Sequence, residues 1–389
     1  MSEKLKNGWT RVVFGDVVRQ VRDIVDPEKA PLERYIAGEH MDTDDLRIRR
    51  WGLIGDGYLG PAFHMHFKPG HVLYGSRRTY LRKVAVADFE GITANTTFVI
   101  ETKDQNVLLP ELLPFIMQTE SFHEHSIKQS KGSVNPYINF SDLSWYEFAL
   151  PPINEQRRIA KLFLCLEQTR ESLVALRDSQ NLLLQSLFNS LCSNAGHQKD
   201  GPISSFCEFV TDGDHNPPPR IHKGVPHLVV ANLHDGRIDE NDCTYISEAD
   251  YERVKKRYSP QEGDVLLSCV GSIGQVAIVP NNYIFSADRS LAVYRPHSSE
   301  LLPEFCSWLL RSKASQNYFN TVATGTAQLH LYLNDLRRHP IRLPSIDNQK
   351  KIVKLMNQVK DYISRTEKRT AEIISLRTKA LCIFENQRT

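Results

Sequence analysis

Two short stretches of this 389-residue chain are nearly the same. Residues 150–162 read LPPINEQRRIAKL and residues 343–355 read LPSIDNQKKIVKL, with seven of the thirteen positions identical at an offset of 193. Upstream, the same offset pairs identical residues without a gap, among them Gly70 with Gly263, Val72 with Val265, Leu109 with Leu302, and Asp142 with Asp335. Collinear matches at one offset, close to half the chain length, indicate an internal duplication. The sequence therefore predicts one structural unit that occurs twice.

Each predicted unit has the same internal order. A mixed segment comes first, in which short β-branched and aromatic runs are separated by Gly, Pro and Asn, a pattern typical of strands and loops with few helices. A Leu-Pro-x-Ile turn follows, where proline stops any helix from upstream, and Asn154 or Asp347 then offers a helix N-cap. We therefore expect an α+β protein with two mixed α/β domains separated by two long helices. The expected parts are domain 1–150, helix 151–195, domain 196–343 and helix 344–389.

Both predicted helices carry a heptad pattern. Alternating steps of three and four residues with mostly apolar occupants predict a coiled-coil seam. We expect this seam at Ile159, Leu162, Leu166, Leu173, Leu176, Leu183 and Leu187 in the first helix and at Ile352, Leu355, Val359, Tyr362, Ile373, Leu376 and Ile383 in the second. If a pseudo-twofold axis perpendicular to the helices relates the units, the paired helices run antiparallel. The alternative is that each helix docks only on its own domain.

The composition is that of a soluble globular protein, with 41% hydrophobic and 24% charged residues. A formal net charge of +2 neither indicates nor excludes a nucleic-acid binder, because basic side chains can gather in local patches. No run approaches the roughly 18 apolar residues of a membrane helix, and the polar N-terminus predicts no secretory signal. The seven cysteines form no C-x-x-C pair, which argues against a zinc site or a disulfide framework and predicts a cytoplasmic protein.

The patterns that suggest catalysis are incomplete. Residues 216–219 read Asn-Pro-Pro-Pro, similar to the loop of adenine methyltransferases, but that loop needs an aromatic ring to stack on a flipped base. Asp88, Glu101 and Lys103 have a spacing that occurs in metal-dependent nucleases, yet the pattern is common by chance and fits surface charges. No phosphate-cradling glycine-lysine loop or complete metal-ligand set occurs. We therefore expect no catalytic residue, bound cofactor or metal; a self-contained DNA methyltransferase is the alternative.

The second half carries several motifs in a fixed order. They read Thr-Asp-Gly-Asp-His-Asn-Pro at 211–217, Asn-Leu-x-x-Gly at 232–236, Gly-Asp-Val-Leu-Leu-Ser-x-x-Gly-Ser-Ile-Gly at 263–274 and Thr-Gly-Thr-Ala-Gln at 324–328. With these motifs and the Leu-Pro-x-Ile turns, essentially the whole chain resembles the specificity subunits of type I restriction-modification systems (HsdS). The first half departs from the pattern, because residues 70–75 read Gly-His-Val-Leu-Tyr-Gly instead of Gly-Asp-Val-Leu-x-Ser. It resembles a different subclass of target-recognition domain.

The resemblance implies a non-catalytic, sequence-specific DNA-recognition subunit. Each domain would read one half of a bipartite, asymmetric site in double-stranded DNA, and the helices would fix the spacer. Two modification subunits, which use S-adenosylmethionine to methylate adenine N6, would dock around the helices. Restriction subunits that use ATP and Mg²⁺ could join them. The alternative from another class is a coiled-coil adaptor that binds only proteins, which gives no reason for polar and basic strips at matched places in both halves.

Basic and polar side chains mark where DNA would be contacted. Residues 70–87 carry four cations and no carboxylate, so this strip can neutralise phosphates, and one arginine could grip a guanine edge. The matching strip, residues 263–280, has no Lys or Arg, so the halves would read different sequences. The candidates in the first half are Arg77, Arg78, Tyr80, Arg82, Lys83, Lys131, Ser133 and Asn135. Those in the second half are Asn216, Arg220, Asn232, Arg253, Lys255, Lys256, Ser268, Ser272, Thr326 and Gln328.

Overall fold

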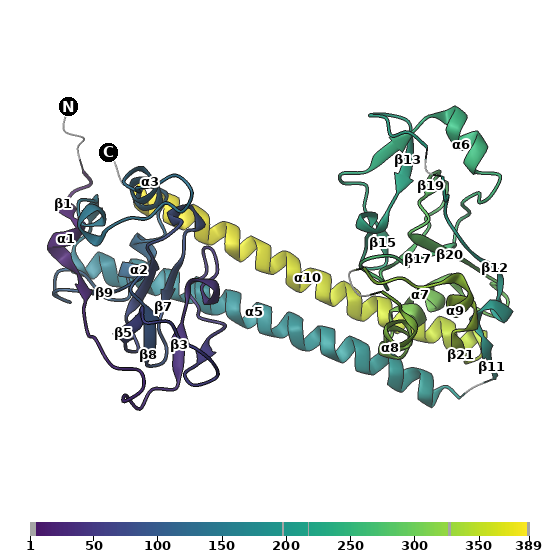
Figure 1. Ribbon diagram of the computed structural model, residues 1–389, viewed down its shortest axis with the longest axis horizontal. Coiled ribbons are helices and arrows are strands. Elements are labelled where there is room, and N and C mark those ends of the chain that lie inside the picture. Colours follow the sequence, from purple (N-terminus) through teal and green to yellow (C-terminus); the bar gives the residue numbers. More distant parts are fainter. Residues whose placement is uncertain (1–4, 197, 217, 326–327, 387–389) are drawn as a thin grey trace. The chain divides into compact units, whose positions relative to one another are not determined.

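The chain forms two compact units, shown as a ribbon in Figure 1. The computed structural model describes residues 5–196, 198–216, 218–325 and 328–386. Unit 1 takes residues 1–174 and 368–389, and unit 2 takes residues 175–367. Each unit therefore contains one mixed domain together with part of each long helix, rather than a domain without its helices.

The described residues of unit 1 form three small β-sheets. Strand β1 (Thr10–Val13) pairs with β10 (Glu147–Leu150), which joins the beginning of the domain to its end. A four-stranded antiparallel sheet has the order β2-β9-β6-β7, with bounds Val18–Val21, Thr97–Thr102, Val72–Gly75 and Val84–Val86. The other four-stranded sheet has the order β4-β3-β8-β5, with bounds Gly52–Leu53, Arg34–Ile36, Gly91–Ala94 and Phe63–Phe67. The short helices are α1 (Phe14–Val17), η1 (Gly38–His40), η2 (Thr79–Leu81), α2 (Leu113–Ile116), α3 (Glu120–Lys128) and α4 (Phe140–Leu143).

Unit 2 repeats this plan. Strand β11 (Lys199–Pro202) pairs with β21 (Pro340–Leu343). The four-stranded sheet has the order β12-β20-β17-β18, with bounds Cys207–Asp212, Leu291–Pro296, Val265–Ser268 and Val276–Ile278. A three-stranded sheet has the order β16-β13-β19, with bounds Thr244–Ile246, Val225–Leu228 and Ser286–Ala287, beside the hairpin β14 (Leu233–His234) and β15 (Arg237–Ile238). Its short helices are η3 (Ile203–Phe206), η4 (Val230–Asn232), α6 (Glu248–Val254), α7 (Pro303–Arg311), α8 (Lys313–Val322) and α9 (Leu333–Arg338).

The ungapped offset of 193 fails inside the matching sheets β2-β9-β6-β7 and β12-β20-β17-β18. Tyr74 of β6 pairs with Phe98 of β9. Leu267, which lies 193 residues after Tyr74, pairs with Ala292, which lies 194 residues after Phe98. The second domain therefore carries one extra residue between these two strands. A count of sequence matches could not locate this insertion, because the identities stand on either side of it.

Each domain core continues onto the two long helices, α5 (Ile153–Asn194) and α10 (Ile346–Glu385). In unit 1, Phe163 of α5 and Phe384 of α10 belong to the same buried cluster as Phe115. In unit 2, Phe188 of α5 and Met356 of α10 lie in the cluster that contains the buried side chains of α7. The last turns of α10 lie beside α3, and Ser121 donates its backbone N–H to the Glu385 carboxylate at 2.6 Å (Figure 1).

The buried faces of α5 and α10 correct the predicted heptad. The positions Ile159, Leu166, Leu173, Leu187, Ile352, Val359 and Ile373 are buried or half-buried, as expected. The other predicted positions, Leu162, Leu176, Leu183, Leu355, Tyr362, Leu376 and Ile383, are exposed. The buried or half-buried positions lie one residue later, for example at Phe163, Leu184, Met356, Ile363 and Phe384. The steps are thus four then three, and apolar patterning missed this because the buried face includes Glu167 and Arg377.

One buried glutamine ties the start of each long helix to its domain. Gln156 accepts a hydrogen bond from the Leu109 N–H at 3.0 Å and donates to the carbonyls of Val107 and Pro151 at 2.8 and 2.9 Å. Gln349 makes the same three bonds 193 residues later, with Leu302 at 3.0 Å and with the carbonyls of Glu300 and Pro344 at 2.8 and 3.0 Å. Because the helices begin at residues 153 and 346, the predicted caps Asn154 and Asp347 lie within the first turn.

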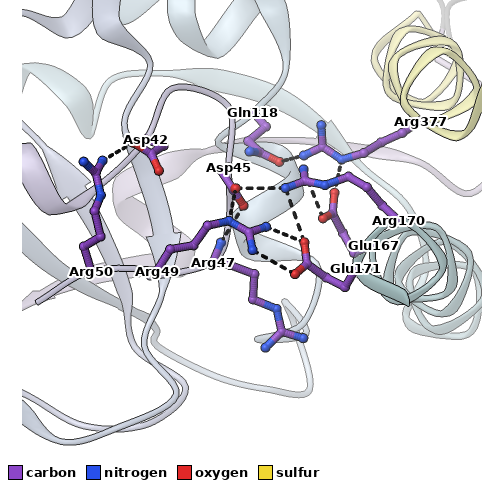
Figure 2. A network of polar contacts seen from close by, with 10 residues as sticks. All are labelled: Asp42, Asp45, Arg47, Arg49, Arg50, Gln118, Glu167, Arg170, Glu171 and Arg377. Atoms are coloured by element: carbon purple, nitrogen blue, oxygen red, sulfur yellow. Dashed lines mark hydrogen bonds and ion pairs between the residues drawn. The ribbon is translucent and has the colours of Figure 1, made fainter. Parts of the chain in front are cut away.

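A buried ion network joins the domain of unit 1 to both helices, as Figure 2 shows. Glu167 of α5 forms an ion pair with Arg377 of α10, and only 8% of each side chain is exposed. Arg377 also donates to the side-chain oxygen of Gln118. Burial lowers the pKa of Arg377, an effect that the Glu167 carboxylate opposes. Removing either charge would leave the other buried without a partner, which would lower the free energy of unfolding by about 3–5 kcal/mol.

The same network anchors the loop at residues 42–50. Arg170 of α5 contacts the Asp45 carboxylate at 2.9 Å. The Glu171 carboxylate accepts a hydrogen bond from each terminal nitrogen of Arg49, at 3.1 and 2.5 Å. The side chain of Arg47 points away from these contacts (Figure 2). The loop is thus held against α5 on both sides of Arg47.

We predict that Gln156→Leu destabilises the attachment of the first domain to its helix. Leucine fills similar space but leaves one N–H and two carbonyls without partners, which should cost at least about 2 kcal/mol. Hydrogen exchange should therefore accelerate at the Leu109 amide, with Gln168→Leu on the exposed face of α5 as the control. Unchanged protection at Leu109 would show that the glutamine does not carry the attachment.

Candidate nucleic-acid interface

A polar cavity of about 720 Å³ opens on the domain of unit 1. Its wall combines two arginines with four amide side chains and several hydroxyls. The lining residues are Gln20, Arg22, Ser76, Arg77, Asn95, Thr96, Phe98, Asn135, Tyr137, Ile138, Asn139, Phe140 and Ser141. No carboxylate is among them, so the cavity presents positive charge and hydrogen-bonding groups of both kinds.

Backbone hydrogen bonds hold the walls of this cavity together. The segment after β6 is central: the Ser76 N–H donates to the Thr96 carbonyl at 3.0 Å, and the Ser76 carbonyl accepts from the Ile138 N–H at 3.0 Å. The Arg78 N–H donates to the Pro136 carbonyl at 2.6 Å. Three segments far apart in sequence therefore lie side by side, and their side chains are presented on a rigid backbone.

Arg77 and Arg78 are the free cations of the predicted basic strip. Both side chains are exposed and form no ion pair or side-chain hydrogen bond with another residue that the structure describes. Arg78 holds a left-handed backbone at φ 50°, which begins the turn η2 and fixes the direction of its neighbours. Tyr80, in the same turn, is also exposed. These side chains can reach a ligand without first breaking an internal contact.

The other basic candidates of the first half already have partners within the protein. Arg82 donates to Asp44 at 3.0 Å and to Glu120 at 2.8 Å, so two carboxylates already neutralise it. The Lys83 ammonium donates to the Gly38 carbonyl at 2.5 Å, and burial lowers its pKa. Lys131 pairs with Asp142 at 2.6 Å. Ser133 and Asn135 are exposed on the loop that follows Lys131, as a contact role requires.

Two polar candidates of the second half are buried structural groups. Asn232 is 2% exposed and closes a turn, accepting from the Val229 N–H at 2.9 Å and donating to the Asp239 carbonyl at 2.9 Å. Ser268 is fully buried and donates to the Ser272 carbonyl at 2.6 Å. Both were predicted as base contacts, and both instead satisfy backbone groups of their own turns.

The remaining candidates of the second half that the structure describes are exposed or half-exposed. Asn216, Lys256, Ser272 and Gln328 lie on the surface. Three basic ones face nearby acids: Arg220 is 3.9 Å from Asp288, Arg253 is 3.4 Å from Asp250 and Lys255 is 2.6 Å from Glu252. Thr326 lies outside the described residues. Proximity to Asp288 does not hold Arg220 tightly, since 3.9 Å is longer than a hydrogen bond.

Sequence reasoning missed several residues that the fold brings to the cavity. Gln20 lies in β2 and Arg22 directly follows this strand, while Asn95 and Asn139 come from two distant loops. A second cavity, of about 520 Å³, shares Gln20 and Arg22 and adds Trp145, which is 63% exposed. These residues stand in no motif, so only the strand pairing could have revealed them.

The proposed nuclease pattern is occupied by ordinary surface contacts. Glu101 accepts from Arg19 at 2.8 Å, and the Lys103 ammonium donates to the Gly15 carbonyl at 2.5 Å. Among the residues that the structure describes, no group of three or more His, Cys, Asp or Glu could hold a metal ion. Across the same residues, no helix is long and apolar enough to cross a membrane.

A family model described as type I restriction modification DNA specificity domain matches residues 64–174 and 234–374. Curated relatives include the Type I restriction enzyme EcoBI specificity subunit of Escherichia coli, 29% identical over 38% of this chain and 31% of the relative. The EcoKI specificity subunit of E. coli K12 is 23% identical over 94% of this chain and 85% of the relative. The chain aligns with only about a third of the EcoBI, EcoDI and MjaX subunits that it matches.

Two solved structures share the fold. One comes from work on the complex assembly and conformational transition of a type I restriction-modification system; it covers 99% of both chains with a TM-score of 0.63 at 20% identity. The other is the S subunit of a type I system from M. genitalium, which covers 100% of both chains with a TM-score of 0.57 at 14% identity. At these identities the likeness establishes the mixed α/β architecture alone.

Proposed function

Since the chain belongs to the type I restriction-modification DNA specificity family, we propose that it reads one half of a bipartite DNA site with each of its two domains. The observation that carries the proposal is the cavity of unit 1, where Arg22 and Arg77 lie among four amides with no carboxylate. Phosphates attract the arginines, while amides and guanidinium groups can pair with base edges. An adaptor that binds only proteins gives no reason for such a lining.

In this proposal the chain catalyses no reaction itself. Its relatives are named specificity subunits. Adenine methylation would then belong to modification subunits that bind S-adenosylmethionine, and DNA cleavage to restriction subunits that use ATP and Mg²⁺. The chain would select the target sequence in double-stranded DNA. A cytoplasmic location remains a prediction from the sequence.

Exposed apolar side chains on the long helices support the docking of modification subunits. Unit 1 exposes Leu162, Leu164, Ile374, Leu376 and Ile383, and unit 2 exposes Leu176, Leu182, Leu183, Leu355 and Tyr362. Clusters of exposed large apolar residues mark protein interfaces. The presence of such side chains on the helices of both units favours two modification subunits for each chain.

Exchange of the second domain tests the proposed function. Replacing residues 201–343 with the same region of a relative should change only one half of the methylated motif, because each domain has its own core and its own polar surface. Methylome sequencing of cells that contain the exchanged chain and its modification subunit gives the answer, and the unexchanged chain is the control. A change in both halves of the motif would contradict independent reading.

The two groups of arginines in the first domain should differ in their effect on DNA binding. Arg78→Ala removes a free cation, so the log-log salt dependence of binding by the assembled methyltransferase should fall by about one if it contacts a phosphate. Arg82→Ala removes a cation already paired with Asp44 and Glu120, and should leave the slope nearly unchanged. Equal slopes for both variants and the wild type would show that Arg78 contacts no phosphate.

We also propose that α5 and α10 pair as an antiparallel coiled coil and set the distance between the half-sites. One heptad inserted after Val174 and one after Glu367 would leave both units intact and lengthen the helices by about 10 Å. That is about three base pairs of B-DNA at 3.4 Å each, so the methylated motif should acquire a longer spacer or be lost. An unchanged motif, fully methylated with its original spacer, would show that other parts set the distance.

A further inference from the structure

The three segments around the cavity of unit 1 have counterparts in unit 2 that are bonded in the same way. The Cys269 N–H donates to the Ser290 carbonyl at 2.8 Å, and the Cys269 carbonyl accepts from the Leu331 N–H at 2.8 Å. The Gly271 N–H donates to the Leu329 carbonyl at 2.9 Å. These bonds repeat those of Ser76 and Arg78, so positions on the two surfaces can be matched one to one.

The matched positions carry the same kinds of side chain in a different order. The central segment has Arg77 in unit 1 and Val270 in unit 2. In the segment on one side of it, Asn95 directly precedes Thr96 in unit 1. Arg289 directly precedes Ser290, the counterpart of Thr96, in unit 2. On the other side stand Asn135 and Gln328. The arginine has therefore moved from the central segment to its neighbour, while an amide is kept on the far side.

Both arginines are free to bind. Arg77 and Arg289 are exposed, and neither has an ion pair or a side-chain hydrogen bond with any residue in the described part of the chain. Neighbouring arginines differ: Arg257 is paired with Asp212, and Arg295 donates to Asp264 at 2.7 Å. A guanidinium on a backbone-bonded loop, with no internal partner to give up, is suited to a planar hydrogen-bonding ligand.

Resting on the proposed reading of DNA, we propose that Arg77 and Arg289 are specificity-determining residues, each of which grips a guanine in its own half-site. Arginine recognises guanine through the O6 and N7 acceptors in the major groove, and Asn or Gln recognises adenine through N6 and N7. Neighbouring segments of a sheet lie about 4.8 Å apart. The shift by one segment thus displaces the guanine by about one base pair relative to the base that meets Asn135 or Gln328.

The test uses the assembled methyltransferase and its own methylated motif. Arg77→Ala should relax discrimination at one guanine of one half-site, and Arg289→Ala at one guanine of the other, by roughly 5- to 150-fold. Arg11→Ala and Arg342→Ala, on the small sheets β1–β10 and β11–β21, are charge-matched controls that should leave the motif unchanged. A wild-type motif without guanine in either half-site would overturn the proposal.

Two further measurements distinguish base reading from phosphate binding and from loss of fold. Arg77→Lys keeps the charge but not the planar fork, so it should retain binding while its discrimination for guanine falls below that of the wild type. Replacing the guanine with 7-deazaguanine removes the N7 acceptor, and should weaken binding of the wild type but not of the Arg77→Ala variant. Full guanine discrimination by Arg77→Ala would overturn the inference while leaving the proposed function intact. If the wild-type assembly methylates no bipartite motif, the proposed function fails as well.

Discussion

The placement of each domain depends on a buried side-chain amide at the start of a long helix. Gln156 and Gln349 each satisfy one backbone N–H and two carbonyls, so they need a donor and an acceptor in the same group. Glutamate would lose the donor, and an apolar side chain would leave all three groups unsatisfied. The turn, the helix and the segment before α2 or α7 are thus joined at one point in each half.

Beyond this shared point, the two halves attach to their helices with different charges. Unit 1 uses Glu167 with Arg377, whereas unit 2 places Lys360, the residue 193 positions after Glu167, against Asp235 at 3.1 Å. Arg311 also pairs with Asp235. The domains therefore share a fold but attach to their helices through different side chains. A domain moved to the other position would leave buried or half-buried charges without partners.

The sequence could predict the duplication, because the identities cluster at turns and at the helix start, where Pro, Gly and Gln have specific geometric roles. It placed alternate heptad positions one residue too early, because Glu167 and Arg377 are buried as a pair that apolar patterning ignores. It predicted both Arg77 and Arg82 as DNA contacts, and it could not distinguish the free side chain from the paired one, because Asp44 and Glu120, the partners of Arg82, each lie 38 residues away in the chain. No sequence motif indicated Arg289, because its proposed role depends on which segment lies beside β17.

The central claim is that one reading unit occurs twice, with each copy responsible for its own half-site. The most direct test places the first domain in both positions. Leu184→Arg and Lys360→Glu reproduce the Glu167–Arg377 pair at the second position, and Ile363→Arg with Ser364→Glu reproduces the partners of Asp45 and Arg49. Methylome sequencing should then show a palindromic motif, with the first half-site repeated in inverted orientation. An unchanged asymmetric motif from this folded, assembled chain would contradict the account.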